Sequence, residues 1–389
     1  MKLILRLLAG ILVGALIGTY APEAVTRGLI TLKLLLGGLI GYLIPLIILF
    51  FIGSGISSLG KSSGRLLAAA VGLSYTSTIV AGLLAFTVGT VAIPMLTAPA
   101  EMTPDETKLA PFFRLEIAPL MGVITALATA FLLGLGVAYT QSPTLRNVLD
   151  EGKRIVELAI SAVVLPILPV YVGCIFAELA AEDAILATLT VFVAVLAIVV
   201  VTQWAWLLMQ YSVAAAVARR NPLVLLKNML PAYFTAIGTM SSAATIPVTL
   251  RSVKKNCRHE NIVDFGVPLC ATIHLSGSMI TIVLCSLAVM TRRLDLAMPS
   301  LGQMLPAILL LGLIMIAAPG VPGGAIMAAA GALTAVLGFS ADAIGLMMAL
   351  YAAQDSFGTA TNVTGDGAIN QILDHMAGEI DREPASPNS

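Results

Sequence analysis

The sequence predicts an all-α polytopic membrane protein with eight transmembrane helices and two re-entrant helical hairpins that form inverted repeats. Of the 389 residues, 58% are hydrophobic and 11% are charged, whereas about a quarter of the residues in a soluble domain are charged. The mean hydropathy is +0.99, and the apolar residues lie in long continuous runs, which are typical of membrane-spanning helices. A β-barrel would show short alternating segments instead.

Composition and motifs exclude several other classes. The formal net charge is zero, so no basic surface favours a nucleic-acid partner. The sequence has no His-Glu-x-x-His motif. Residues 55–62, GISSLGKS, carry the letters of a P-loop, but they lie at the end of a predicted membrane span and not after a strand. We therefore expect neither an ATPase nor another enzyme. The four cysteines have no metal-binding spacing and are expected to act as small apolar residues.

The first six predicted spans are apolar and nearly free of charge. They cover residues 3–20, 29–59, 66–94, 112–139, 155–177 and 184–216. The first run also resembles a signal peptide, but its length and the orientation of the later spans favour a membrane helix. In the third span, the hydroxyls of Thr76, Ser77 and Thr78 are expected to serve helix packing.

The loops between these spans alternate in charge. Basic loops follow the second, fourth and sixth spans, and the intervening loops are acidic. The positive-inside rule then places the N-terminus and the basic loops in the cytoplasm. With eight spans, the C-terminus lies there too. We therefore expect a multi-pass protein of the plasma membrane, which is the inner membrane if the source is a Gram-negative bacterium.

The pattern changes after the sixth span, where two segments predict re-entrant hairpins. Residues 222–256 begin and end on the basic side, with a tip containing serine and proline near residues 236–249. Residues 305–337 have a tip rich in proline and glycine at residues 317–324. Non-helical backbone persists at membrane depth only where protein or a water-filled cavity covers it, so both tips are expected to be buried.

Each predicted hairpin is followed by an unusual span. The seventh, residues 262–290, is predicted to break near residues 271–278, and the eighth, residues 341–378, carries many polar side chains. The first hairpin enters from inside and the second from outside. This arrangement indicates the inverted repeat found in secondary transporters.

Four polar residues of the eighth span share one narrow stripe. If Asp355 is placed at zero on a helical wheel, Thr359 falls at about 40°, Asn362 at about −20° and Asp366 at about 20°. Ionisable groups at membrane depth normally mark a pathway, an ion or a partner charge. No basic residue lies nearby in the sequence, so two carboxylates on this stripe favour a cation from solution over a packing seam.

Four motifs in this half carry a family resemblance. They are SSAATIP at 241–247, PLCATIHLSG at 268–277, PGVPGG at 319–324 and DSFGTATNVTGD at 355–366. In this order and topology, the chain resembles the dicarboxylate/amino acid:cation symporter family, the glutamate transporter homologues, and within it a neutral-amino-acid-like branch.

The resemblance implies a homotrimer in membrane lipid that works as an elevator. A static scaffold would comprise residues 1–65 and 99–182, and a mobile transport domain residues 66–98 and 183–378. The second hairpin would be a gate, and residues 379–389 a disordered tail. The activity implied is secondary symport of an amino acid with Na⁺.

The resemblance also implies a binding site. Its substrate-binding residues would be Ser241, Ser242, Ser278, Val321, Pro322, Asp355, Gly358, Thr359 and Asn362. Asp355 would bind the amino group, and Asn362 the α-carboxylate. The Na⁺ ligands would be Cys270, Thr272, His274, Met315, Ile316, Ala318, Asn362 and Asp366. One ion would lie on Asp366 and Asn362, and the second under the gate beside Thr272.

Two departures from the family pattern restrict the function. Family members that take acidic substrates carry an arginine where this chain has Gly358. A substrate side-chain carboxylate would be buried without a partner there, so we expect a neutral amino acid such as serine, threonine or alanine. A third sodium site would need a carboxylate where this chain has Ser276, and hydroxyls where it has Ala81 and Gly82. We therefore expect about two coupled Na⁺ ions.

His274 leaves alternatives open. An unperturbed histidine has a pKa near 6.5, so His274 could carry a coupled proton and make the protein a proton-coupled symporter. The other interpretation is a neutral imidazole that hydrogen-bonds a hydroxyl of a hairpin. A further alternative, suggested by the resemblance alone, is a substrate-gated anion conductance.

Overall fold

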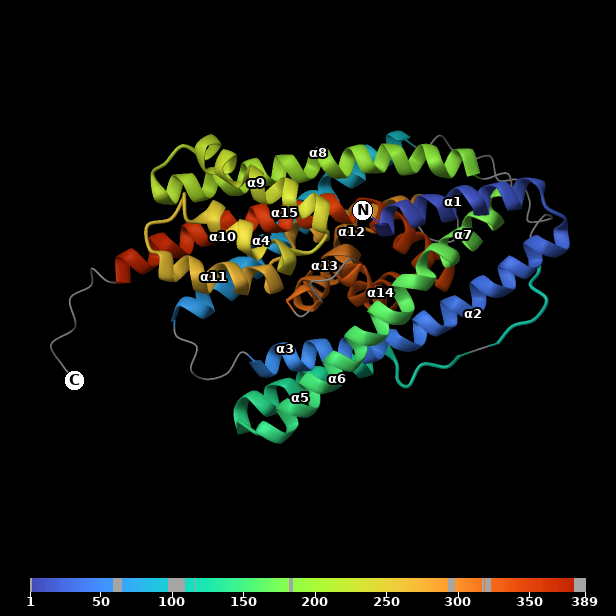
Figure 1. Ribbon diagram of the computed structural model, residues 1–389, viewed down its shortest axis with the longest axis horizontal. Helices are drawn as coiled ribbons and strands as arrows, with labels where there is room; N and C mark the ends of the chain where they lie inside the picture. Colours follow the sequence, from blue (N-terminus) through green and yellow to red (C-terminus); the bar gives the residue numbers. More distant parts are fainter. Residues whose placement is uncertain are drawn as a thin grey trace.

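The computed structural model describes residues 2–58, 65–96, 109–115, 117–181, 185–292, 298–316, 318 and 323–380. These residues form helices and irregular segments, with no strand among them. The two longest helices, α8 (Ile185–Ala218) and α15 (Ala341–Ile380), run along the long axis of the molecule (Figure 1). The predicted tail at residues 379–389 began too early, because residues 379 and 380 still belong to α15. Residues 381–389 and the acidic loop at residues 97–108 lie outside the described residues.

The N-terminal helices pack closely because glycine lines their contact. The first is α1 (Lys2–Tyr20), and it lies along α7 (Leu165–Ala181). A Cβ atom on Gly14 would come within 2.0 Å of the carbonyl oxygen of Gly173, so only glycine allows the two backbones to approach this closely. The helix α2 (Glu23–Ile47) joins the same group through a 2.5 Å ion pair between Lys33 and Glu178.

The predicted second span continues beyond α2 with an irregularity. A π-helical turn, η1 (Ile48–Ile52), links α2 to α3 (Gly53–Ser58). Pro45 lies inside α2 just before this turn. Proline lacks the N–H that a regular helix requires, and π-turns often occur where the regular pattern is interrupted. The predicted third span is the continuous helix α4 (Arg65–Leu96).

The predicted fourth span was too long. The helix α5 (Val123–Thr140) begins eleven residues later than expected, and the preceding segment is irregular. Phe112 donates its N–H to Thr31 Oγ1 at 2.9 Å, and Arg27 stacks over the Phe112 ring at 4.8 Å. This segment therefore runs beside α2, as Figure 1 shows. Pro119 and Gly122 disfavour helix there.

The predicted fifth span was too short. A preceding helix, α6 (Pro143–Ala159), occupies the stretch that we expected to be a basic loop, and the π-turn η2 (Ile160–Val164) connects it to α7. Ser142 caps α6 by accepting the N–H of Leu145. The axis bends by 50° at the junction, next to Pro166, whose ring cannot continue a straight helix.

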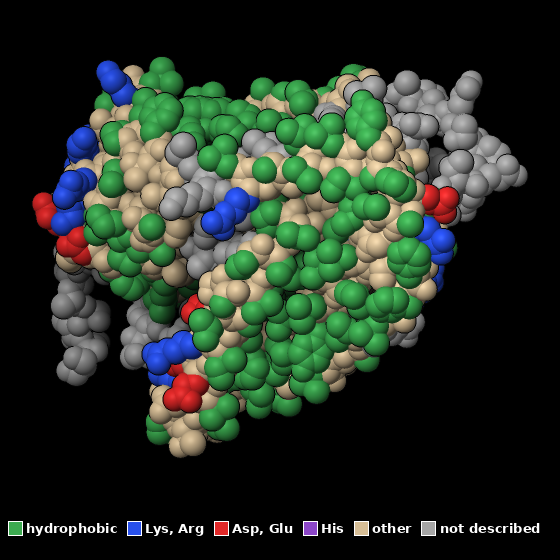
Figure 2. Space-filling model, turned by 45° about the vertical axis from the view of Figure 1, so that its right-hand side comes forward, with side chains coloured by type: hydrophobic (Ala, Val, Ile, Leu, Met, Phe, Trp, Pro, Cys, Tyr) green, Lys and Arg blue, Asp and Glu red, His purple; other side chains and the backbone are tan. Residues whose placement is uncertain are grey.

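The prediction of eight spans is confirmed only in part. Four helical stretches within the described residues are long and apolar enough to cross a membrane, or five if the bent α6–α7 pair counts as one span. Other apolar helices are shorter. Figure 2 shows a broad hydrophobic surface on which most charged side chains lie toward the edges. This distribution agrees with a lipid-facing band.

Both predicted hairpins and the broken helix are present. The first hairpin pairs α9 (Pro222–Thr239) with α10 (Ser242–Val253), and the second pairs α13 (Leu301–Met315) with α14 (Gly324–Leu337). The first reverses at Met240, which has a φ of 54°. The seventh span is divided into α11 (Glu260–Ile273) and α12 (Ser276–Arg292). His274 and Leu275 separate the two halves.

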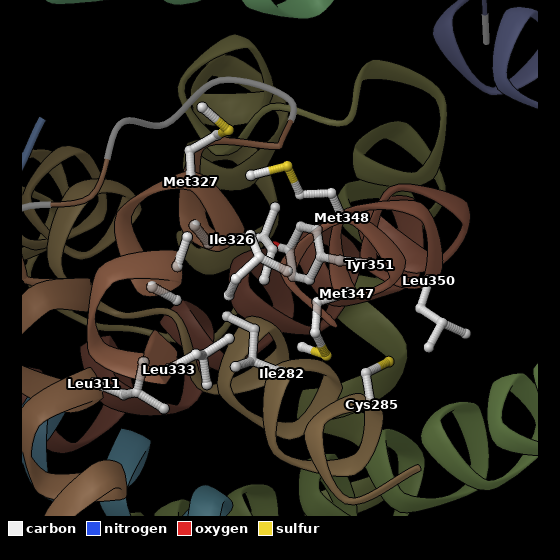
Figure 3. Close-up of a cluster of buried hydrophobic side chains, with 14 of the residues drawn as sticks. Ile282, Cys285, Leu311, Ile326, Met327, Leu333, Met347, Met348, Leu350 and Tyr351 are labelled. Atoms are coloured by element: carbon white, nitrogen blue, oxygen red, sulfur yellow. The ribbon is translucent and has the colours of Figure 1, made fainter. Parts of the chain in front are cut away.

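The polar helix α15 lies inside the molecule. It packs against α8, α9, α10, α11 and α12. At its N-terminal half, Met347, Met348 and Tyr351 join apolar side chains of α12, α13 and α14 in one buried cluster, shown in Figure 3. This cluster holds the start of α15 against the second hairpin. The polar C-terminal half of α15 then packs against the first hairpin (α9 and α10) and the two halves of the broken helix (α11 and α12).

Candidate functional site

The predicted polar stripe is a real feature of one unbroken helix. Asp355, Thr359, Asn362 and Asp366 are 4%, 5%, 2% and 0% exposed, respectively. Because α15 is helical throughout, their spacing places them along one face over about 16 Å. Protein therefore encloses two carboxylates and an amide, which lie beside the tip of the second hairpin and the break between α11 and α12.

Asp355 contacts the tip of the second hairpin. Its Oδ2 accepts a hydrogen bond from the N–H of Gly323 at 2.7 Å, and Gly323 is the N-cap residue of α14. A helix N-terminus carries partial positive charge and favours a carboxylate. The hydroxyls of Tyr351 and Thr359 lie beside the same group. Among the described residues, no lysine, arginine or histidine forms an ion pair with Asp355.

Asn362 caps the second half of the broken helix. Its Oδ1 accepts the N–H groups of Gly277 at 2.8 Å and Ser278 at 3.2 Å. Its Nδ2 donates to Ser278 Oγ at 2.9 Å, and the Tyr351 hydroxyl donates to the same oxygen at 3.0 Å. The structure thus brings Asn362 and Ser278 together at the free N-terminus of α12, where a carboxylate would also be favoured.

His274 joins three helices at the break. Its Nδ1 lies 2.9 Å from Asp366 Oδ1, and its Nε2 lies 2.8 Å from Ser77 Oγ on α4. Gln210 of α8 donates from Nε2 to the same serine oxygen at 2.8 Å. The side chains of His274 and Asp366 are 0% and 1% exposed. Both ring nitrogens therefore have partners, but the hydroxyl beside the imidazole is that of Ser77 on α4 and not the expected hydroxyl of a hairpin.

Ser77 and Gln210 are site residues that sequence reasoning missed. We had assigned Ser77 to helix packing, and only the fold shows that its hydroxyl points at His274. Gln210 did carry a signal. It lies seven residues after Gln203 in an otherwise apolar helix, and this spacing places both amides on one face. Gln203 donates to Thr281 Oγ1 at 3.0 Å, so both glutamines face the broken helix.

The tip of the first hairpin lies beside α15 but is bonded mainly within itself. Ser241 accepts the N–H of Ala244 and so caps α10, and Ser242 is buried at 8% exposed. Thr245 donates to the carbonyl oxygen of Ser241 at 2.8 Å. A contact of Ser241 or Ser242 with substrate remains a prediction. Val321 and Pro322, at the other tip, lie outside the described residues.

The predicted sodium ligands fall into two groups. Asp366, Asn362, Cys270 and His274 surround the helix break, where the carbonyl oxygen of Cys270 accepts the N–H of His274. The predicted gate-side ligands are more dispersed. Thr272, on α11, is exposed and donates to the carbonyl oxygen of Leu269. Met315 lies on α13, and α11 shares no extensive interface with α13. Ile316 and Ala318 follow at the end of α13. The second sodium site therefore remains a prediction.

Buried oxygen atoms near the break suit a cation. Within the described residues, Asp366 Oδ2, Asn370 Oδ1 and Ser276 Oγ have no hydrogen-bond partner. An unsatisfied buried polar atom costs about 1–3 kcal/mol, and a bound ion would remove this cost. Oxygen atoms are the donors that coordinate Na⁺ in secondary transporters. Within the described residues, no group of three or more His, Cys, Asp or Glu side chains could hold a metal ion.

Gly358 lies against the broken helix. A Cβ atom there would be 3.5 Å from Thr281 Oγ1 and 3.7 Å from the backbone of Gly277. These are ordinary contacts, so a small side chain fits without displacement. The glycine brings no charge to the stripe, and the surrounding groups are neutral.

Together, a buried polar helix, two helical hairpins and a helix that is broken beside them are features typical of secondary transporters. A comparison with protein families agrees: the model of the sodium:dicarboxylate symporter family matches residues 3–376. The chain belongs to this family. Its members are transporters.

Individual relatives are similar over part of the chain. Excitatory amino acid transporter 1 of Ambystoma tigrinum is 32% identical over 164 residues, which is 42% of this chain and 30% of the relative. The Rattus norvegicus protein of the same name is 31% identical over 163 residues, 41% of this chain and 29% of the relative. Excitatory amino acid transporter 5 of Mus musculus is 29% identical over 161 residues, 41% and 28%, respectively. The matches span less than a third of these relatives.

Proposed function

We propose that the protein couples Na⁺ entry to uptake of a neutral amino acid such as serine, threonine or alanine. The observation that carries the proposal is Asp355. It is a carboxylate that is 4% exposed, and no described basic residue forms an ion pair with it. A buried charge without a partner is strongly unfavourable. The ammonium group of an amino acid supplies the partner.

The choice of a neutral substrate rests on Gly358. Its neighbours are Thr281 and the backbone of Gly277, which offer hydrogen bonds but no positive charge. A substrate carboxylate on this side would lose its hydration without an ion pair, at a cost of several kcal/mol. The relatives named as excitatory amino acid transporters are thus informative about the family, while the proposed substrate rests on this chain's own residues.

Two features support about two coupled Na⁺ ions. The unpartnered oxygens around Asp366 would accommodate one ion. A third ion would need room beside α4, but a Cβ on Gly82 would lie 2.8 Å from Ile308 and 3.1 Å from Met279. The packing there is tight and apolar, which is unfavourable for a cation.

An elevator movement is part of the proposal. The scaffold (residues 1–65 and 99–182) and the transport domain (66–98 and 183–378) would slide past each other within a homotrimer in the plasma membrane. A cavity of about 300 Å³ supports this division. It is lined by residues of α2 and α7 on one side, including Gly41 and Tyr171, and of α14 and α15 on the other, including Thr334 and Met348. Packing between the two predicted bodies is therefore incomplete.

Proton coupling through His274 is the second candidate, and its direct contact with Asp366 is the observation that favours it. The two candidates differ in what drives uptake. In proteoliposomes, a Na⁺ gradient without a pH gradient should drive accumulation of serine or alanine. A pH gradient alone should not.

The same assay tests the substrate. Uptake of labelled serine and alanine should exceed that of aspartate by at least about tenfold, because the site lacks a cation for a second carboxylate. Tight, Na⁺-driven aspartate uptake would contradict the neutral-substrate proposal. Accumulation driven only by protons, with a His274→Asn variant that loses it, would favour the second candidate.

A further inference from the structure

The hydrogen bonds around His274 form one directed chain. An ionised carboxylate only accepts hydrogen bonds, so the imidazole donates its Nδ1–H to Asp366 Oδ1 across 2.9 Å. In the neutral imidazole, Nε2 is then an acceptor. The Ser77 hydroxyl supplies its hydrogen to Nε2 across 2.8 Å, and Gln210 Nε2 donates to Ser77 Oγ across another 2.8 Å. Hydrogen positions are assigned here from the network of partners.

This chain leaves the carboxylate asymmetric. Asp366 Oδ1 is bound to the imidazole, while Oδ2 is buried and has no partner within the described residues. Only Oδ2 remains to bind a cation. The orientation of the imidazole therefore decides which oxygen the coupling ion meets and where it lies.

Two residues outside the predicted site control that orientation. Ser77 comes from α4 and Gln210 from α8, whereas His274 lies in the two-residue break between α11 and α12. The backbone of His274 is extended, with a φ of −114°, so no regular helix holds its ring in place. The ring is held by side chains: Asp366 contacts Nδ1, while Ser77 at 2.8 Å and Gln210 at 3.4 Å contact Nε2.

We propose that Ser77 and Gln210 are positioning residues for the coupling-ion site. They act through His274. Their contacts with Nε2 fix the tautomer and the plane of the imidazole ring. The ring then binds Asp366 Oδ1, which leaves Asp366 Oδ2 free for the cation. The inference rests on the proposed Na⁺ coupling. At metal sites, residues that hydrogen-bond the ligating histidines and carboxylates have a comparable role. Mutating such residues lowers metal affinity by about 10–100-fold.

The chain offers a matched pair of substitutions on α4. Ser77→Ala removes the hydroxyl that binds His274. Thr78→Val removes the hydroxyl of the next residue, which is buried and donates to Ser74 O within its own helix, at 2.9 Å. Ser77→Thr keeps the hydroxyl and serves as the rescue variant. A purely structural role would affect Ser77→Ala and Thr78→Val alike.

Na⁺ affinity can be measured without transport. A ligand that binds only the folded state raises its stability in proportion to the logarithm of ligand concentration over Kd. Thermal unfolding of the purified protein, at increasing NaCl with choline chloride to keep ionic strength constant, therefore reports the apparent Kd. We expect Ser77→Ala to raise this Kd about tenfold or more, and Ser77→Thr and Thr78→Val to stay within about twofold of the unmodified protein.

Uptake kinetics supply a second measurement. At saturating Na⁺, the maximal rate and the substrate KM of Ser77→Ala should approach those of the unmodified protein, since only ion binding is weakened. Gln210→Leu should act in the same direction, because Ser77 then loses its donor. An unchanged Na⁺ affinity in Ser77→Ala, or an equal loss in Thr78→Val, would overturn the inference. An unmodified protein that shows no Na⁺ response would instead overturn the proposed coupling itself.

Discussion

Replacing Asp355 by asparagine tests the centre of the proposed site. The substitution keeps the shape of the side chain, and its oxygen can still accept the Gly323 N–H that Asp355 accepts at 2.7 Å. What is lost is the negative charge that faces the substrate ammonium. Because Asp355 is 4% exposed, solvent screens this interaction little, and the full charge-assisted contribution is expected to disappear.

The magnitude follows from that contribution. A hydrogen bond to a charged group contributes about 1.5–3 kcal/mol, and each 1.4 kcal/mol corresponds to a factor of about ten in affinity. Asp355→Asn should therefore raise the KM for serine or alanine by about 10- to 100-fold at saturating Na⁺. The assay is initial-rate uptake into proteoliposomes, together with Na⁺-dependent substrate binding to the purified protein.

Asp374 provides the matched control for this prediction. It lies on the same helix, is 3% exposed, and accepts the backbone N–H groups of Arg258 on Oδ2 and of His259 on Oδ1, at 3.0 and 2.8 Å. An asparagine keeps only one acceptor oxygen, so Asp374→Asn is expected to lower stability. It lies about 28 Å along the helix from Asp355 at 1.5 Å per residue, so it should leave the KM within about twofold. The reasoning is refuted if Asp355→Asn shifts the KM by less than about threefold, or if both variants shift it equally.

Three further predictions concern other parts of the molecule. Asn362→Ala leaves two N–H groups at the start of α12, those of Gly277 and its neighbour, without an acceptor; thermal unfolding should show a loss of about 2–4 kcal/mol, and an unchanged melting temperature would argue against the cap. Gly41→Phe should enter the cavity, because a Cβ there has no atom within 4 Å. It should lower the maximal uptake rate without changing substrate affinity, while Gly136→Phe, equally open but on α5, should not. Burial raises the pKa of the Cys257 thiol to about 12, so at about pH 8 maleimide should label it at least roughly a hundredfold more slowly in the folded than in the unfolded protein; rapid labelling of the folded protein would contradict this.

Much of the candidate site could be predicted because its spacing is local. On one helix, the positions of Asp355, Asn362 and Asp366 relative to each other depend only on about 100° of rotation per residue. The hairpin tips were visible in the same way, because serine, proline and glycine interrupt long apolar runs. The break at His274 was expected for this reason too.

Boundaries were less predictable where hydropathy and helix do not coincide. Phe112 is apolar and was placed in a span, but its N–H bonds Thr31 and its ring packs under Arg27. In contrast, the charged stretch around Arg146 was expected to be a loop and is a helix. Hydropathy reports the environment of a segment, whereas caps and prolines decide where its helix begins and ends.

By itself, the sequence determined the class of this protein, its membrane character, its repeated hairpin–helix layout and the polar stripe on α15. These features depend on composition and on periodicity within single segments. Only the tertiary structure decided how the stripe is completed. Ser77 and His274 are 197 residues apart, and their contact exists because α4, α8 and the broken helix pack together. This packing decides which hydroxyl hydrogen-bonds which ring nitrogen, and the spacing of residues within one segment cannot predict it.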